Sequence, residues 1–181
     1  MPEIIHFRGS DKIIKEKNLT KNVQATLEYI QDVLYGTLHR GELMRQALEE
    51  MGWREDGTLN IFEGRRYAFK GFKRGIGIEG SFAAYEFILE GLLRLQIGFD
   101  KGKIDAGILM LNSARSEKSS YGTTAELAKT EVEMLYPRID LPVAIALFDL
   151  GKPIFPDEEG GEMSGLSIPA DKEGEQKDLE D

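Results

Sequence analysis

Apolar residues spaced three and four positions apart predict two helices in the first third of the chain. The first helix is expected to begin near Thr20 and to end before Gly36, and the second to run from about residue 40 to 51 and to end at Gly52. Trp53 follows the second helix directly and is expected to pack back on it. The first twenty residues are mixed and mostly polar, and we predict no element there.

Strand patterns follow the two helices. Asp56-Gly57 indicates a turn, after which residues 59–62 are typical of a short strand. Residues 66–73 alternate apolar and charged side chains, as a strand with one exposed face does. Residues 76–79 form the next strand, and we expect it to pair with residues 66–73 as a hairpin.

The second half of the chain alternates helical and strand patterns. The strongest helix of the chain comes first, and it is followed by two apolar strands that are expected to be buried on both faces, as central parallel strands are. A polar loop and a helix capped by Thr123 or Thr124 separate these strands. The predicted ranges are 83–97 for the first helix, 104–111 for the first strand, 112–122 for the loop, up to about 135 for the second helix and 141–148 for the last strand.

The order of these elements predicts the fold class. Two helices and three strands are followed by helix, strand, helix and strand, which predicts an α/β (α+β) fold with a mixed sheet flanked by helices. An antiparallel meander is expected first and βαβ crossovers after it. We expect residues 1–156 to form this domain. Residues 157–181 are rich in Gly, Glu, Asp and Ser and have few large apolar residues, so we expect a disordered acidic tail.

The acidic net charge of the chain is concentrated in this tail. The chain carries −9, of which residues 157–181, with ten carboxylates and two lysines, contribute −8, so residues 1–156 carry −1. A nearly neutral folded part does not argue against a nucleic-acid partner. We expect the tail to aid solubility, and we also hypothesise that it folds over the basic hairpin described below and competes with DNA.

The sequence lacks three features that would indicate a secreted or membrane protein. The chain has no cysteine, which excludes a disulfide framework and a thiolate metal site and is typical of a reducing cytoplasm. Residues 1–17 lack a basic region followed by an apolar run, so we predict no signal peptide. No apolar stretch approaches the length of a membrane span, about eighteen residues. We therefore expect a cytoplasmic protein with no membrane partner.

A glycine-rich segment at 75–80, GIGIEG, matches the dinucleotide-binding pattern G-x-G-x-x-G. That pattern requires a buried apolar strand immediately before it and a helix that opens inside it. Lys70, Lys73 and Arg74 precede it instead, and residues 76–79 are themselves typical of a strand. We interpret the glycines as part of that strand rather than as a nucleotide site.

Glu79 and Ser81 are candidates for a metal-dependent phosphodiesterase site. Hydrolysis of this kind requires carboxylates that converge on Mg²⁺ and a group that orients or deprotonates water. One layout has an acid on the first of two antiparallel strands, and an acid and a polar residue two positions apart on the second, so that the last two share a face. Glu79 and Ser81 have that spacing, although a surface glutamate at a strand end fits the local pattern as well. Glu49 and Glu50 are expected to be solvated unless the second helix abuts the meander.

A ten-residue stretch of the predicted hairpin, residues 65–74, contains five basic side chains: Arg65, Arg66, Lys70, Lys73 and Arg74. Such a cluster suits contacts with a phosphate backbone, and we predict DNA binding from it. A solvated hairpin face is the alternative interpretation.

The run 76–111, IGIEGSFAAYEFILEGLLRLQIGFDKGKIDAGILML, resembles the core of the BglII/BstYI-type restriction endonucleases, which belong to the PD-(D/E)XK nuclease superfamily. The resemblance lies in a strand that ends in a glutamate, in aromatic residues that open the next helix, and in a turn that leads into an apolar strand. It extends over residues 20–150. The residues that carry it are Glu79, Phe82, Tyr85, Phe87, Gly102-Lys103-Ile104-Asp105 and Gly107, with Gly52-Trp53 upstream and Pro137-Arg138-Ile139-Asp140-Leu141-Pro142 before the last strand.

The resemblance implies a homodimer that cuts double-stranded DNA with Mg²⁺. It implies that Glu79 binds the metal and that Ser81 takes the position of a Gln or Lys in relatives. The metal-binding Asp of the family belongs about nine residues before the Glu, where this chain has Lys70, and residues 57–99 contain no Asp. A cation at that position repels Mg²⁺.

Two interpretations of the site follow. In the first, a displaced acid such as Glu63 or Glu50 supplies the second metal ligand, Lys70 stabilises charge, and the protein is a divergent, Mg²⁺-dependent type II restriction-endonuclease-like enzyme. In the second, Lys70 neutralises Glu79, and the protein is a non-catalytic DNA-binding module or partner subunit of a restriction or defence system. A third interpretation, a winged helix-turn-helix regulator built from residues 20–74, leaves the two buried strands unexplained.

Overall fold

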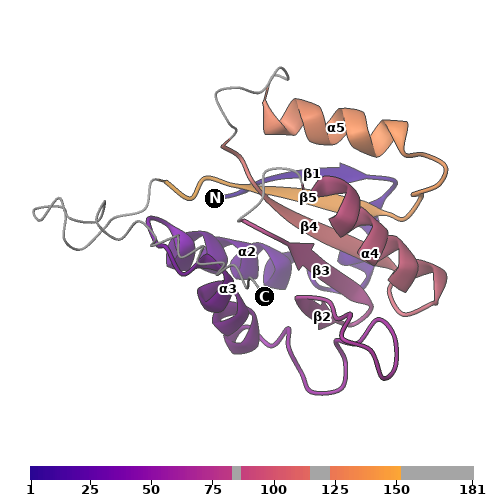
Figure 1. The fold of residues 1–181 in the computed structure, drawn as a ribbon, viewed down its shortest axis with the longest axis horizontal. Helices are drawn as coiled ribbons and strands as arrows, with labels where there is room; N and C mark the ends of the chain where they lie inside the picture. The colour runs from indigo at the N-terminus through magenta and orange to yellow at the C-terminus, as the bar shows by residue number, and fades with distance from the viewer. Residues whose placement is uncertain (83–86, 115–122, 152–181) are drawn as a thin grey trace, which may run out of the picture.

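The computed structural model describes residues 1–82, 87–114 and 123–151. Within them, a five-stranded mixed sheet has the order β1-β5-β4-β3-β2 (Figure 1). The central strands β3, β4 and β5 run parallel, and the edge strands β1 and β2 pair antiparallel with their neighbours, which confirms the predicted mixed α/β class. The strands are β1 (Glu3–Phe7), β2 (Gly71–Lys73), β3 (Ile76–Gly80), β4 (Ala106–Asn112) and β5 (Val143–Phe148).

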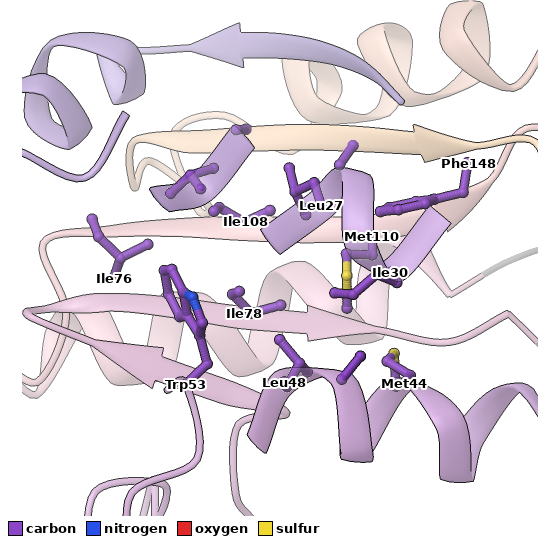
Figure 2. Close-up of a cluster of buried hydrophobic side chains, with 14 of the residues drawn as sticks. Leu27, Ile30, Met44, Leu48, Trp53, Ile76, Ile78, Ile108, Met110 and Phe148 are labelled. Atoms are coloured by element: carbon purple, nitrogen blue, oxygen red, sulfur yellow. The ribbon is translucent and has the colours of Figure 1, made fainter. Parts of the chain in front are cut away.

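Helices cover both faces of the sheet. One face carries α1 (Ser10–Glu16), α2 (Thr20–Leu34) and α3 (Arg40–Glu50), and the other carries α4 (Ile88–Asp100) and α5 (Thr124–Met134). Side chains alternate between the two faces of a strand. Ile78 of β3 and Ile108 of β4 therefore lie in the core under α2 and α3 (Figure 2), whereas Leu109 of β4 lies in the core under α4 and α5.

Trp53 fixes the segment between α3 and β2. It is fully buried and lies with Leu48 and Ile78 in the core on the α2–α3 face (Figure 2), as its position after the helix predicts. Its indole Nε1–H donates to Asn22 Oδ1 at 3.0 Å and to Thr26 Oγ1 at 3.1 Å, and both acceptors belong to α2. The buried indole therefore keeps a partner for its N–H group while its ring fills the core.

The segment before β2 differs from the prediction. The strand predicted at 59–62 does not form, and the strand predicted at 66–73 is reduced to β2. Ile61 N–H instead donates to Tyr67 O at 2.9 Å, and an isolated bridge joins the two arms of this segment. Because these backbone groups pair within the segment, they do not extend the ladder along β3. We call residues 59–69 the irregular hairpin.

Element boundaries differ at both ends of the chain. β1 and α1 lie where no element is predicted; β1 is an edge strand without a fully buried side chain, so it lacks the apolar run that marks the central strands. The helix predicted at 83–97 begins at Ile88 and ends at Asp100, and residues 83–86 are outside the described part. The predicted domain end at residue 156 and the acidic tail are outside it as well. No described helix has the length and apolar character to cross a membrane.

β2 covers only part of β3. Its three residues pair with the first three residues of β3, and Lys70 N–H adds one more bond, to Ile78 O at 2.9 Å. Among the described residues, Glu79 and Gly80 have β4 on one side and no strand on the other. The C-terminal end of β3 is therefore an open edge of the sheet.

Candidate functional site

Glu79 lies at this open edge, on β3, opposite Leu109 of β4. Its side chain is 0% exposed. It points to the α4 face because its neighbour Ile78 points to the α2–α3 face. Gly91 lets α4 pack closely there, since a Cβ at Gly91 would lie 2.4 Å from Leu109 Cδ1. A glycine in the helix thus brings the α4 backbone down onto the sheet beside a buried carboxylate.

Arg94 of α4 is the direct partner of this carboxylate. Its Nε donates to Glu79 Oε1 at 3.1 Å, and its Nη2 donates to Ala68 O at 3.0 Å in the irregular hairpin. The guanidinium also lies 5.9 Å from the centroid of the Tyr67 ring. One side chain therefore links β3, α4 and the irregular hairpin.

Burial dominates the electrostatics of Glu79. Loss of hydration raises the pKa of the Glu79 carboxyl, and this outweighs the opposing effects of Arg94, Lys70 and the Gly80 backbone N–H, in that order. Glu79 Oε2 is buried and has no hydrogen-bond partner. Lys70 is thus close enough to act on the carboxylate by its charge, although Arg94 makes the hydrogen bond.

A cleft of about 710 Å³ opens at this end of β3, between residues of α3 and α4. Among the described residues that line it, five are basic and two are acidic, so its lining favours anions over cations. The basic residues are Arg40, Arg45, Arg54, Lys70 and Arg94, the acidic ones are Glu79 and Glu90, and Ser81 and Asn112 are among the polar neutral ones. We call this the cationic cleft.

Two of the arginines that line the cleft have a buried side-chain donor without a partner. Arg54 Nη1 donates to Lys70 O at 2.8 Å, and Arg40 Nη2 donates to Gly151 O at 3.4 Å. The Nε atoms of both arginines are buried and have no partner. Buried donors without a partner are uncommon in native proteins and indicate a site that a ligand or water completes. Arg45 differs, because Glu42 and Glu49 on its own helix pair with it.

The comparisons with known proteins bear on the fold. No protein-family model and no curated protein matches the chain. The crystal structure of restriction endonuclease BglII complexed with a DNA 16-mer matches with a TM-score of 0.56 and 17% identity, over 85% of this chain and 78% of that chain. The structure of free BglII matches with a TM-score of 0.53 and 17% identity, over 82% and 79%. The chain has a restriction-endonuclease-like fold. The fold that the resemblance implies is thus confirmed.

The structure brings some predicted site residues of this restriction-endonuclease-like fold together. Glu79, Ser81 and Lys70, predicted as a catalytic group, all line the cationic cleft. Glu63 and Glu50, predicted as further metal ligands, do not line it. Glu50 accepts a hydrogen bond from the Tyr29 hydroxyl on the surface of α2 and α3. Glu63 lies in the irregular hairpin, where its charge opposes the lowering of the pKa of Lys103 by burial.

No metal-binding cluster accompanies Glu79 within the described ranges. No three His, Cys, Asp or Glu side chains gather there in a way that could hold an ion. The described residues around Glu79 therefore do not fit Mg²⁺, which prefers several oxygen ligands in octahedral geometry. Glu90 is the second described acid in the cleft, and two cations, Lys70 and Arg94, act on Glu79.

Of the five basic residues in the predicted DNA-binding cluster, Lys70 lines the cleft and the other four do not. Arg65 and Arg66 are exposed on the irregular hairpin and do not line the cleft. Lys73 Nζ donates to Met51 O at 3.2 Å and lies 5.7 Å from the Trp53 ring centroid. Arg74 sits at the β2–β3 turn and donates to Lys17 O at 3.2 Å.

Sequence reasoning missed the arginines that α3, α4 and the α3–β2 connection contribute. Arg94 had a signal, because it is the basic residue inside the apolar run of α4, ILEGLLRLQIGFD. A charge at such a position usually has a buried partner. Arg40 and Arg54 had none, since Arg40 is the first residue of a helix with several other charged residues and Arg54 follows Trp53 in a connecting segment.

Proposed function

We propose that the protein binds duplex DNA through the cationic cleft and that it is a non-catalytic module of the restriction-endonuclease-like fold. The observation that carries the proposal is Lys70. It stands where the resemblance calls for a metal-binding Asp, and its charge acts on Glu79. Arg94 already occupies Glu79 Oε1.

The balance of charges favours a phosphate over a metal ion. A divalent cation close to Lys70 and Arg94 is repelled by several kcal/mol at an effective dielectric constant of about 20. A phosphodiester instead gains from the same cations and from Arg40 and Arg54, which also line the cleft. Arginine also offers a planar pair of donors that matches two phosphate oxygens.

Duplex DNA is the polyanion chosen here because the matching BglII structure is a complex with a DNA 16-mer. We expect the cleft to hold the backbone of one strand rather than a whole duplex, because its volume is only about 710 Å³. The homodimer and the restriction-modification setting that the resemblance implies stay predictions and are part of this proposal.

Replacing Lys70 with glutamine is expected to weaken DNA binding about tenfold in low-salt buffer that contains EDTA. With one phosphate contact fewer, one counterion fewer leaves the DNA on binding, and the favourable free energy of that release is lost. Fluorescence anisotropy of a labelled duplex measures the affinity. The matched control is Lys21→Gln on the exposed face of α2, outside the cleft, which is expected to change little. Equal affinities for wild type and Lys70→Gln would contradict the proposal.

The alternative, Mg²⁺-dependent hydrolysis, is favoured by one observation. Glu79 Oε2 is buried without a partner and lies in the same cleft as Glu90. Incubation of a plasmid with Mg²⁺ or Mn²⁺ separates the two functions. The non-catalytic proposal predicts no difference in cutting between wild type and Glu79→Gln, whereas cutting that disappears in the variant would establish the enzyme.

A further inference from the structure

We infer that the acidic segment of this chain, residues 157–181, occupies the cationic cleft and competes there with DNA. The inference rests on the proposed function for the competition with DNA, but the contact between segment and cleft does not depend on it. The observations behind it are the place where the chain leaves β5, the charges on each side, and the hydrogen bonds that occupy the alternative basic surface.

The chain leaves the fold at the rim of the cationic cleft. Gly151 is the last described residue, and its carbonyl oxygen accepts the 3.4 Å hydrogen bond from Arg40, which lines the cleft. Gly36 N–H donates to Leu150 O at 2.8 Å, which fixes the segment after β5 against the start of the α2–α3 connection. Thr37, next in that connection, lines the cleft as well. The exit of the chain is therefore held beside the basic lining.

The acidic segment begins within reach of that lining. Five residues, 152–156, separate Gly151 from the first carboxylate, Asp157. A chain spans at most about 3.5 Å per residue, so the first carboxylate can lie anywhere up to roughly 20 Å from Gly151. The ten carboxylates and two lysines of residues 157–181 give a charge of −8, opposite in sign to the lining of the cleft.

A tethered segment gains from its attachment. A short linker gives an attached group an effective concentration of about a millimolar. Weak carboxylate–arginine contacts are then enough to keep the segment on the cleft at low salt, and they weaken as salt screens them.

Among the described residues, the cleft gathers five basic ones, whereas Arg65, Arg66 and Arg74 are the exposed basic residues of the basic hairpin that the sequence first suggests. Lys73 and Arg74 of that hairpin donate to the carbonyl oxygens of Met51 and Lys17 and lie outside the cleft. Arg40 and Arg54 keep buried Nε–H donors that lack a partner. An acidic segment in the cleft therefore meets five basic residues against two acidic ones among the described lining residues.

The test uses the full chain with the ten carboxylates of residues 157–181 changed to amides, which we call the neutral-segment protein. A labelled peptide with the sequence of residues 157–181 is titrated against it by fluorescence anisotropy. We expect the peptide to bind the neutral-segment protein in a salt-dependent way. Adding Arg40→Gln and Lys70→Gln to that protein, at two residues that line the cleft, is expected to weaken peptide binding at least tenfold. The control Lys21→Gln, on the exposed face of α2, is expected to bind as before. Circular dichroism confirms that each variant is folded.

A DNA titration completes the test. The neutral-segment protein is expected to bind a labelled duplex about tenfold tighter than wild type at low salt, and the free peptide is expected to reverse this gain. Peptide binding that is absent, or equal in the cleft variant and its parent, overturns the inference and leaves the proposed function standing. Peptide binding to the cleft without DNA binding by any variant supports the contact and overturns the proposed function.

Discussion

Replacing Arg94 with alanine is expected to lower the free energy of unfolding by about 3 kcal/mol at neutral pH. Breaking a buried ion pair typically costs 3–5 kcal/mol, because the remaining charge stays buried without its partner. Glu79 is 0% exposed and Arg94 is 21% exposed, so the low end of that range applies. The same change removes the hydrogen bond to Ala68 O that holds the irregular hairpin.

The cost of Arg94→Ala is expected to depend on pH in a defined direction. Burial already raises the pKa of Glu79 above its unfolded value, and loss of Arg94 raises it further. Between the unfolded and folded pKa values the folded state binds more protons, so stability falls as pH rises through that window. The deficit of the variant is therefore smallest at the acidic end of the pH range, where the folded carboxyl is protonated with or without Arg94. It is largest above the variant's folded pKa.

Urea unfolding of wild type and variant from pH 4 to pH 8 measures this effect. Leu93→Ala is the matched control, since Leu93 precedes Arg94 on α4 and is 49% exposed, and we expect a change within about 0.5 kcal/mol. In a Glu79→Gln background, Arg94→Ala is expected to cost much less, because no buried carboxylate remains. A deficit that is the same at every pH would contradict the assigned role of Arg94.

Replacing Lys70 with aspartate is expected to convert the cleft from an anion site to a weak site for divalent cations. The change places a second carboxylate close to Glu79 and removes the cation that acts on it. The free Oε2 of Glu79 and the side chain of Glu90 then supply further oxygen ligands. We expect Mn²⁺ binding with a dissociation constant of roughly a millimolar, in the range of weak carboxylate sites.

Titration calorimetry with Mn²⁺ at pH 8 measures this conversion. The pH is chosen because two neighbouring carboxylates raise each other's pKa. Wild type and Lys21→Asp, a matched charge reversal on the exposed face of α2, are expected to show no comparable binding. DNA affinity of Lys70→Asp is expected to fall more than tenfold, since the site changes by two charges. Equal Mn²⁺ binding by wild type and Lys70→Asp would show that Lys70 does not exclude the metal.

Residues 76–148 were predictable in outline because their patterns are long and regular. The run from β3 through α4, β4 and α5 to β5 consists of apolar strands and amphipathic helices, and the parallel order follows from the alternation of the two. The spacing of Glu79 and Ser81 predicted a shared location, and both line the cleft. β1 was missed because an edge strand without a fully buried side chain has no such pattern.

Tertiary contacts decided the rest of the site. Arg94 reaches Glu79 from a helix fifteen residues along the chain, and Arg40 and Arg54 enter the cleft from α3 and the segment after it. No spacing rule relates these positions. Strands were predicted at residues 59–62 and 66–73, yet the backbone groups of residues 59–69 pair with one another. Tertiary contacts also divide the basic cluster, because Lys73 and Arg74 donate to backbone carbonyl groups and do not line the cleft.

The salt dependence of DNA binding in EDTA tests the central claim most directly. The claim is that phosphates, and no metal ion, are bound by basic residues of the cleft. The affinity of a labelled duplex is measured at several salt concentrations for wild type and for Arg40→Gln/Lys70→Gln, both residues being part of the lining. The account predicts binding without metal and a slope of log affinity against log salt that is lower by about 2 in the variant, near 0.9 per lost phosphate contact. Binding that requires Mg²⁺, or slopes that are the same for both proteins, would contradict it.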